Sequence, residues 1–416
     1  MAGVSAYPTY PAASVQPAAP YPSAPAGASV YPTTGPVAVA PPAVPTESPE
    51  VSLRRKQMEV LSRYIRLECD YRELLTYFPM PKDISHELYR RAMGHGIHPR
   101  YWPMLNVMRI FDFAFVVDNS GSMSASIDNK DLPRGERYRY KELMFNSARL
   151  ADIMVAADAD GVDVYTLNPI SVPGAVRSNF AGFHGSRFAN VNSATKMAEI
   201  VGQTPRGGTP LTSAMQAAIT DHRVANSNPL KPYKPLMLIV ATDGQPANRA
   251  AFYRLVKERN RDQVFITFLI CSDNPDDTSY LDSLDTGESQ KRLTSSGRRK
   301  VDGVESIDDF RSERASIIRI QGRGFGYTRG DHEARKLCGP VFPILDKIDQ
   351  EKLPDFTTPG EDYMPPEIQA VILEIASNSR AAEEKMREYA KGNPEIARYM
   401  LDLPPPPAVG CGCILM

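Results

Sequence analysis

Between residues 110 and 350, short apolar runs alternate with longer stretches of helical periodicity. The apolar runs are FDFAFVVD (111–118), VDVYTLN (162–168), LMLIVATD (236–243) and VFITFLIC (264–271), and polar turns bound each of them. Helical periodicity covers residues near 138–158, 193–202, 210–225 and 247–260. Because the runs are apolar at nearly every position, the strands should be buried on both faces. We therefore expect an α/β fold, with a doubly wound, mostly parallel sheet and helices on both faces.

The segments that flank this region have other patterns. Residues 1–50 are rich in Pro and Ala, contain four Tyr-Pro pairs and carry no charged side chain before Glu47. Such a segment cannot form a core, so we expect a disordered arm that serves as a spacer or as a ligand for proline-recognising domains. We expect helical extensions at 51–109 and 351–403, and a tail at 404–416.

Within the first extension, apolar residues from Leu53 to Leu75 recur at helical spacing with basic residues between them. This pattern predicts one amphipathic helix. Its basic face is either solvated, on a helix that packs against the main domain, or adapted to an anionic membrane surface.

Composition and charge narrow the classes of function. The chain has 416 residues, 42% of them hydrophobic, which is enough for a large core. A formal net charge of −1 gives no reason to expect a nucleic-acid partner. No signal peptide or membrane-spanning run is evident, and Cys69, Cys271 and Cys338 lack metal-ligand spacing. We therefore expect the folded part in the cytosol.

Oxygen-bearing side chains follow two of the predicted strands. Asp118, Ser120 and Ser122 come directly after the first run, and Asp243 ends the third. Between them, PRGGTPLTSAM contains two glycines that permit a tight turn before Thr209. Because the carboxyl ends of parallel strands meet at one edge of a sheet, these loops should lie close together.

Two carboxylates and three hydroxyls form a set of hard oxygen ligands. Such a set suits Mg²⁺, with Mn²⁺ or Ca²⁺ as alternatives, and it leaves a coordination position for the carboxylate of a partner. Each segment also has a purely structural interpretation, in which the aspartate caps a turn and the hydroxyls cap helices.

The five residues together resemble the metal-ion-dependent adhesion site of von Willebrand factor type A (vWA) domains. Asp118, Ser120 and Ser122 match the DxSxS element, Thr209 the second-loop threonine and Asp243 the third-loop aspartate. The resemblance covers about residues 110–350 and is strongest with intracellular, copine-like forms. It implies a Rossmann-like vWA fold with a divalent cation at the upper sheet edge, which binds an acidic side chain of a protein ligand.

The sequence departs from the copine pattern in two respects. There is no room for the tandem lipid-binding domains that precede the module in copines, and the loop SASIDNKDLPRGERYR is long. Asp128 and Asp131 in that loop belong to a second, weaker cation site or to an ordinary solvated loop.

No catalytic motif accompanies the cluster of oxygens. The chain lacks a GxxxxGK phosphate loop, a dinucleotide fingerprint and a nucleophile elbow. We therefore expect a metal-dependent binding module and not an enzyme. The alternatives are a scaffold with a non-functional metal site, a non-catalytic subunit of a larger enzyme complex, and an uncharacterised enzyme.

The C-terminal tail, PPPPAVGCGCILM, resembles a lipidation signal. Cys413 begins a C-a-a-X motif whose final methionine favours a farnesyl group. One lipid chain gives only marginal attachment, and Cys411 is a candidate for palmitoylation as the second signal. In a eukaryotic cell, we expect the protein on the cytosolic face of a membrane.

Overall fold

The part of the chain that the structure describes contains a six-stranded sheet with helices around it. This computed structural model describes residues 48–65, 69, 71–78, 87–97, 101–127, 137–228, 233–272, 280–281, 303–322, 327–342, 345 and 348–349. The strands are β1 (Asp112–Val117), β2 (Val162–Thr166), β3 (Ser186–Val191), β4 (Leu236–Thr242), β5 (Val264–Ile270) and β6 (Val304–Ile307). The helices are α1 (Pro49–Ile65), α2 (Tyr71–Tyr77), α3 (Glu87–Gly94), α4 (Trp102–Met108), the 3-10 helix η2 (Gly121–Ser124), α5 (Arg139–Ala157), α6 (Ala194–Val201), α7 (Leu211–Ala225), α8 (Arg249–Glu258), α10 (Phe310–Gln321) and α11 (Arg329–Cys338).

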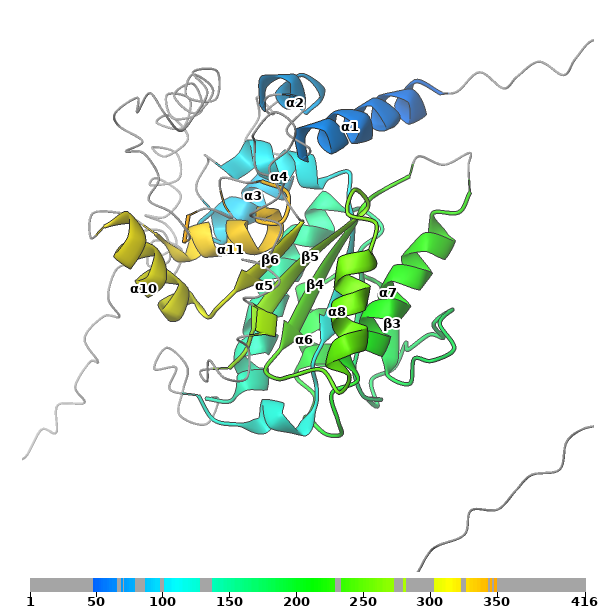
Figure 1. Cartoon of the computed structure of the whole chain (residues 1–416), viewed down its shortest axis with the longest axis vertical. Helices are drawn as coiled ribbons and strands as arrows, with labels where there is room; N and C mark the ends of the chain where they lie inside the picture. Colours follow the sequence, from blue (N-terminus) through cyan, green and yellow to red (C-terminus); the bar gives the residue numbers. More distant parts are fainter. Residues whose placement is uncertain are drawn as a thin grey trace, which may run out of the picture. The chain divides into compact units, whose positions relative to one another are not determined.

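The strands lie in the order β3-β2-β1-β4-β5-β6, and Figure 1 labels β3, β4, β5 and β6. β1 pairs in parallel with β2 and β4, the pairs β4–β5 and β5–β6 are also parallel, and β3 runs antiparallel to β2. The chain builds the sheet away from β1 on one side and then returns to add β4 on the other. A topological switch point therefore lies between β1 and β4, where ligands bind beyond the carboxyl ends of the strands in sheets of this type.

Helices cover both faces of the sheet. Alternate side chains of β1 belong to two separate cores, one shared with α5 and α6 and the other with α7 and α8. The first core takes Phe113, Phe115 and Val117, and the second takes Ala114 and Val116. Successive side chains of a strand point to opposite faces, so when both faces are buried no alternate position faces water and the strand is apolar throughout. The predicted fold class, a doubly wound and mostly parallel α/β sheet, is confirmed.

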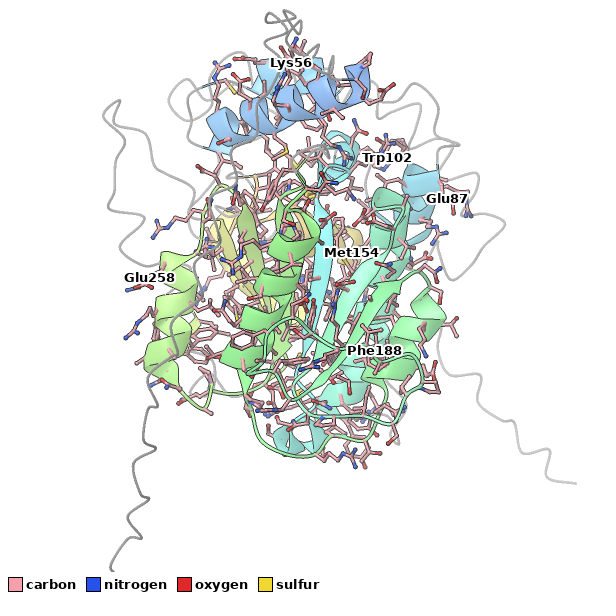
Figure 2. All side chains as sticks on the ribbon, turned by 90° about the vertical axis from the view of Figure 1, so that its right-hand side faces the viewer. Lys56, Glu87, Trp102, Met154, Phe188 and Glu258 are labelled. Carbon is pink, nitrogen blue, oxygen red and sulfur yellow. The ribbon has the colours of Figure 1, made fainter. Side chains whose placement is uncertain are left out.

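The segment before the sheet forms α1 to α4, whose apolar side chains share the core of the α5 face. Trp102, the first residue of α4, is buried there, whereas Lys56 of α1 points into solvent (Figure 2). The single helix predicted from Leu53 to Leu75 is wrong, because α1 and α2 are separate helices. Gln57 Nε2 donates to the Tyr77 carbonyl oxygen at 2.9 Å, and a continuous helix would hold these residues about 30 Å apart. Periodicity alone could not reveal that α2 folds back on α1.

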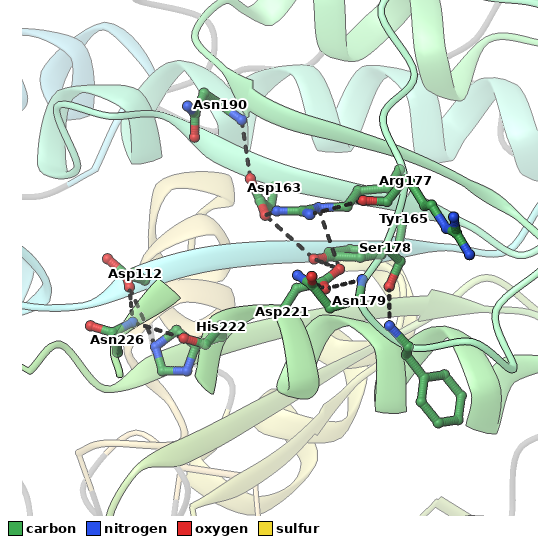
Figure 3. A network of polar contacts seen from close by, with 12 residues as sticks. Asp112, Asp163, Tyr165, Arg177, Ser178, Asn179, Asn190, Asp221, His222 and Asn226 are labelled. Carbon is green, nitrogen blue, oxygen red and sulfur yellow. Dashed lines mark hydrogen bonds and ion pairs between the residues drawn. The ribbon is translucent and has the colours of Figure 1, made fainter. Parts of the chain in front are cut away.

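A buried polar network fastens the segment after β2 to β2, β3 and α7 (Figure 3). Asp221 of α7 is 2% exposed. One of its carboxylate oxygens accepts from the backbone and side-chain nitrogens of Asn179 at 2.6 and 2.7 Å. The other accepts from the Tyr165 hydroxyl at 3.1 Å and lies 3.4 Å from Arg187 Nε. Because a buried carboxylate is tolerated only when it is paired and hydrogen-bonded, this network is a structural anchor.

Several predicted segments lie outside the described residues. These are nearly all of the arm at 1–50, the extension at 351–403 and the tail at 404–416. α1 begins at Pro49, just inside the predicted end of the arm. Among the helices that the structure describes, none combines the length and apolarity that crossing a bilayer requires.

Candidate metal centre

Asp118 follows the last residue of β1 and is buried at the end of the sheet, with 1% of its surface exposed. Its backbone N–H donates to the Ala241 carbonyl oxygen of β4 at 2.9 Å, which places it beside the switch point. One carboxylate oxygen accepts the Ser120 backbone N–H at 2.9 Å, and the other accepts the Thr242 hydroxyl at 2.7 Å. These two bonds fix the orientation of the carboxylate.

The electrostatics of the site disfavour its own negative charge. Burial raises the pKa of Asp118 to about 6, against the hydrogen bonds from Ser120 and Thr242 and with the help of the nearby charge of Asp243. Two carboxylates that share a buried site are unfavourable when both are ionised, unless a positive charge compensates them. The site therefore favours a cation.

Side-chain hydrogen bonds join three of the five predicted ligands, and a fourth, Asp118, accepts the backbone N–H of Ser120. Ser120 Oγ lies 3.0 Å from Ser122 Oγ. Ser122 Oγ donates to Asp243 Oδ1 at 2.8 Å, although the two residues are 121 positions apart in the sequence. Asp243 directly follows β4, and its side chain is fully buried. The loops after β1 and β4 thus meet as the strand pattern predicts.

Backbone hydrogen bonds attach the loop that contains Thr209 to the DxSxS loop. Arg206 N donates to the Asn119 carbonyl oxygen at 2.7 Å, and Gly121 N donates to the Gly207 carbonyl oxygen at 3.1 Å. Gly207 has φ of +83°, a left-handed conformation that glycine adopts most readily. A Cβ atom at Gly207 would lie 2.4 Å from Asn168 Oδ1. The backbone conformation therefore favours glycine at this position, and a Cβ atom there would also displace the Asn168 side chain.

Thr209 joins the site through its backbone. It is half-buried, and its carbonyl oxygen accepts the Ala247 N–H at 3.2 Å, which connects this loop to the one after Asp243. The three loops therefore form one hydrogen-bonded unit, with Asp118, Ser120, Ser122 and Asp243 in a contiguous chain and Thr209 on the adjoining loop.

Three further residues shape the site and were not anticipated from the sequence. Thr242 orients Asp118, as described above. Asn168, at the end of the VDVYTLN run, donates from Nδ2 to the Gly208 carbonyl oxygen at 2.8 Å. Arg139 Nη1 donates to Asp243 Oδ2 at 2.9 Å. A polar residue at the end of an apolar run was a usable signal for Asn168, but no local signal links Arg139 to a carboxylate 104 positions away.

The donor set fits a divalent cation. All of its members are carboxylate or hydroxyl oxygens, which are the ligands that Mg²⁺, Mn²⁺ and Ca²⁺ prefer. Its two carboxylates together carry the charge that would balance one divalent ion, although Arg139 pairs with one of them. The ligands also come from three loops that are already bonded to one another, so little ordering would be needed for an ion to bind.

A second acidic cluster lies at the amino end of β1. Carboxylate oxygens of Asp112, Asp158 and Asp160 lie within 4.8 Å of one another. Lys234 Nζ contacts all three, at 2.9, 2.6 and 3.0 Å respectively. Burial and the hydrogen bond to Asp160 raise the pKa of Asp158 to about 8, so Asp158 holds a proton at neutral pH. The lysine and the proton compensate this cluster without a metal ion.

Comparison with known proteins finds distant structural matches. No protein-family model matches the chain, and no curated protein matches its sequence. Two of the matching solved structures are proximal thread matrix protein 1 from the mussel byssus and the manganese-loaded TRAP protein of Plasmodium vivax. The mussel protein is 15% identical over 50% of this chain and 46% of its own, with a TM-score of 0.29. The Plasmodium protein is 14% identical over 50% of this chain and 72% of its own, with a TM-score of 0.30.

The chain thus spans less than half the length of the mussel protein. Because both TM-scores lie below 0.5, the fold rests on the strand order of this chain alone.

Three predicted features lie outside the described residues. They are the second cation site at Asp128 and Asp131, the prenylation site at Cys413 and the palmitoylation site at Cys411.

Proposed function

We propose that this protein is a vWA-type binding module that uses a divalent cation, Mg²⁺ first, to bind an acidic side chain of a partner protein. The ligands would be Asp118, Ser120, Ser122, Thr209 and Asp243. The observation that supports this proposal best is the bond from Ser122 Oγ to Asp243 Oδ1 at 2.8 Å. It brings together two loops that the sequence keeps far apart, at the switch point where sheets of this type bind ligands.

Each residue has a definite task in this proposal. Asp118 supplies a negative charge, and Thr242 holds its carboxylate in place. Ser122 directs its proton to Asp243, which leaves the oxygen lone pairs for an ion. A bound divalent ion would supply the positive centre to which the carboxylate of a partner attaches.

We propose binding and not catalysis at this site. The hydroxyl of Ser122 donates to a carboxylate that a guanidinium also holds. The group next to Ser122 is a carboxylate already held in an ion pair, and not the histidine that activates a serine in hydrolase triads. Neither serine thus has the activated nucleophile arrangement that acyl transfer requires.

We propose further that the protein is attached to the cytosolic face of a eukaryotic membrane. The support is the sequence of the tail, with Cys413 in a C-a-a-X motif and Cys411 as a second lipidation site. The net charge of −1 favours a protein partner over nucleic acid. Stable attachment would need the second lipid, because one prenyl chain binds reversibly.

Calorimetry on the full-length chain tests the metal site. Titration with MgCl2 or MnCl2 should show one site in wild type and none in Asp118→Ala, with far-ultraviolet circular dichroism unchanged. Asp160→Asn is the matched control, because it removes a carboxylate from the acidic cluster at the other end of β1. It should leave metal binding intact. Equal binding by wild type and Asp118→Ala would contradict the proposal and favour a scaffold with a non-functional site.

Affinity capture tests the partner. Proteins that wild type retains should be released by EDTA, and Asp243→Ala should not retain them. Replacement of one acidic residue in the retained protein should abolish its binding to wild type. Retention that survives both EDTA and Asp243→Ala would show that the partner binds elsewhere.

Cell fractionation tests the anchor. Cys413→Ser should move the protein from the membrane to the soluble fraction, and Cys411→Ser should release part of it or redirect it to internal membranes. An unmodified C-terminal mass in cells with active prenyltransferase would refute the lipid anchor without affecting the metal site.

A further inference from the structure

Arg139 is the first residue of α5, and it holds Asp243 through the carboxylate oxygen that Ser122 does not use. Its Nη1 donates to Asp243 Oδ2 at 2.9 Å, and its Nη2 donates to Ser272 Oγ, just beyond β5, at 2.9 Å. Ser122 Oγ donates to Asp243 Oδ1 at 2.8 Å. Both oxygens of this predicted ligand are therefore already engaged.

The position of Arg139 in α5 does not explain this contact. A cation in the first turn of a helix is disfavoured, because the helix dipole places positive charge at that end. The side chain is nevertheless 13% exposed and reaches across to a carboxylate with no exposed surface. The ion pair with Asp243 accounts for this placement.

We infer that Arg139 is a tethered cation that competes with the divalent ion for Asp243 and thereby sets the metal affinity of the site. This inference rests on the proposed function and names how the site is regulated. The guanidinium compensates one of the two carboxylate charges and occupies Oδ2. Because the interior screens charges weakly, a divalent ion on the same carboxylate is repelled by it.

The same arrangement couples the metal to the partner. With one negative charge already compensated, the site binds a divalent ion weakly on its own. A carboxylate from the partner adds the missing negative charge, so each ligand raises the affinity of the other. Without the guanidinium, metal binding should become strong by itself, and its dependence on the partner should decrease.

The test compares Mn²⁺ affinity of full-length variants by calorimetry. Arg139→Gln should bind Mn²⁺ about tenfold more tightly than wild type, which corresponds to ~1.4 kcal/mol. Arg139→Lys keeps the charge and should stay within about threefold of wild type. Arg249→Gln is the matched control, because Arg249 lies over the ring of Tyr280, 5.4 Å from its centroid, at the same end of the sheet. It should leave the affinity unchanged.

Four outcomes would overturn the inference. Unchanged or weaker binding by Arg139→Gln shows that Arg139 does not compete. Equal tightening by Arg139→Lys shows that its charge is not the cause. Equal tightening by Arg249→Gln shows a general electrostatic effect. Absence of Mn²⁺ binding by both wild type and Arg139→Gln overturns the inference together with the proposed function.

The remaining outcomes separate the two proposals. Wild-type binding that Asp118→Ala abolishes supports the proposed function whatever Arg139→Gln does. If Arg139→Gln binds Mn²⁺ and wild type does not, the inference is supported, provided that the variant carrying both Arg139→Gln and Asp118→Ala does not bind Mn²⁺. If Arg139→Gln does not fold, Mn²⁺ affinity is measured on Ser272→Ala instead. This substitution removes one anchor of the guanidinium, so Mn²⁺ should bind about threefold more tightly, and an unchanged affinity overturns the inference.

Discussion

Replacing Asp118 with asparagine should stabilise the metal-free protein at neutral pH and abolish its stabilisation by metal. Burial raises the pKa of Asp118 to about 6 in the folded chain, from an ordinary value of 3.8. A raised carboxyl pKa means that the folded state binds the proton more tightly than the unfolded state. This tighter proton binding adds to the free energy of unfolding. The contribution is fully present below pH 3.8 and is lost as the pH rises through 6.

The size of this effect follows from the shift of about two pKa units. At ~1.36 kcal/mol per unit, the titrating carboxyl of Asp118 lowers the free energy of unfolding, relative to a permanently neutral group, by about 3 kcal/mol at pH 7.5 and by under ~1 kcal/mol at pH 4. An amide keeps the local hydrogen bonds. Its oxygen can accept the Ser120 N–H, and its nitrogen can donate to the Thr242 hydroxyl, which can turn toward the Gly244 carbonyl oxygen 3.2 Å away.

Urea unfolding in EDTA measures this difference. Trp102 is the only tryptophan in the chain and is buried, so its emission reports unfolding. Asp118→Asn should exceed wild type by about 3 kcal/mol at pH 7.5 and by under ~1 kcal/mol at pH 4. Saturating MgCl2, at 100 times the dissociation constant, should then stabilise wild type alone, by about 2.7 kcal/mol. The reasoning fails if wild type is the more stable protein in EDTA at pH 7.5, or if the difference does not change with pH.

Three other substitutions test the framework of the site. Gly207→Ala should weaken Mg²⁺ binding by calorimetry at least about tenfold (~1.4 kcal/mol), because its Cβ meets Asn168 Oδ1, whereas Gly208→Ala has nothing within 4 Å of its Cβ and should bind normally. Asp221→Ala should lower the free energy of unfolding in urea by about 3–5 kcal/mol, since it leaves buried donors without their acceptor; a loss below ~1 kcal/mol would contradict the anchoring role. Lys234→Met should destabilise the protein more at pH 8 than at pH 5 in thermal melts, because Asp158, whose pKa is about 8, is protonated at pH 5 and depends less on the ammonium there; equal losses at both pH values would argue against it.

The sequence predicted the centre of the sheet better than its edges. β1, β2, β4 and β5 coincide with the four apolar runs, because helices on both faces leave their residues little contact with water. β3 and β6 lie at the two ends of the sheet. Their sequences, SRFANV and VESI, contain polar residues or are short. β3 mixes buried and partly exposed positions, whereas β6 is buried throughout but has only four residues, two of them Glu and Ser, so neither strand forms a continuous apolar run.

The predicted ligands were accessible from sequence for a similar reason. Asp118 and Asp243 each follow a buried parallel strand, and strand direction places both at one edge. Arg139 has no such rule, because its contact depends on the path of the chain between β1 and α5 and on the rotamer of a long side chain. The periodicity of residues 53–75 likewise hid the reversal between α1 and α2, which only the contact between Gln57 and Tyr77 reveals.

The two ends of β1 show why only one of them calls for a metal ion. At the amino end, three carboxylates including Asp112 meet the ammonium of Lys234, and Asp158 holds a proton because its pKa is about 8. Asp160 is 68% exposed in its side chain, so water stabilises the remaining charge. At the carboxyl end, Asp118 and Asp243 are both buried, and one guanidinium meets one of the two charges. The pKa of Asp118, about 6, leaves it mostly ionised at neutral pH, so we expect a cation from outside the chain to stabilise this end of the strand.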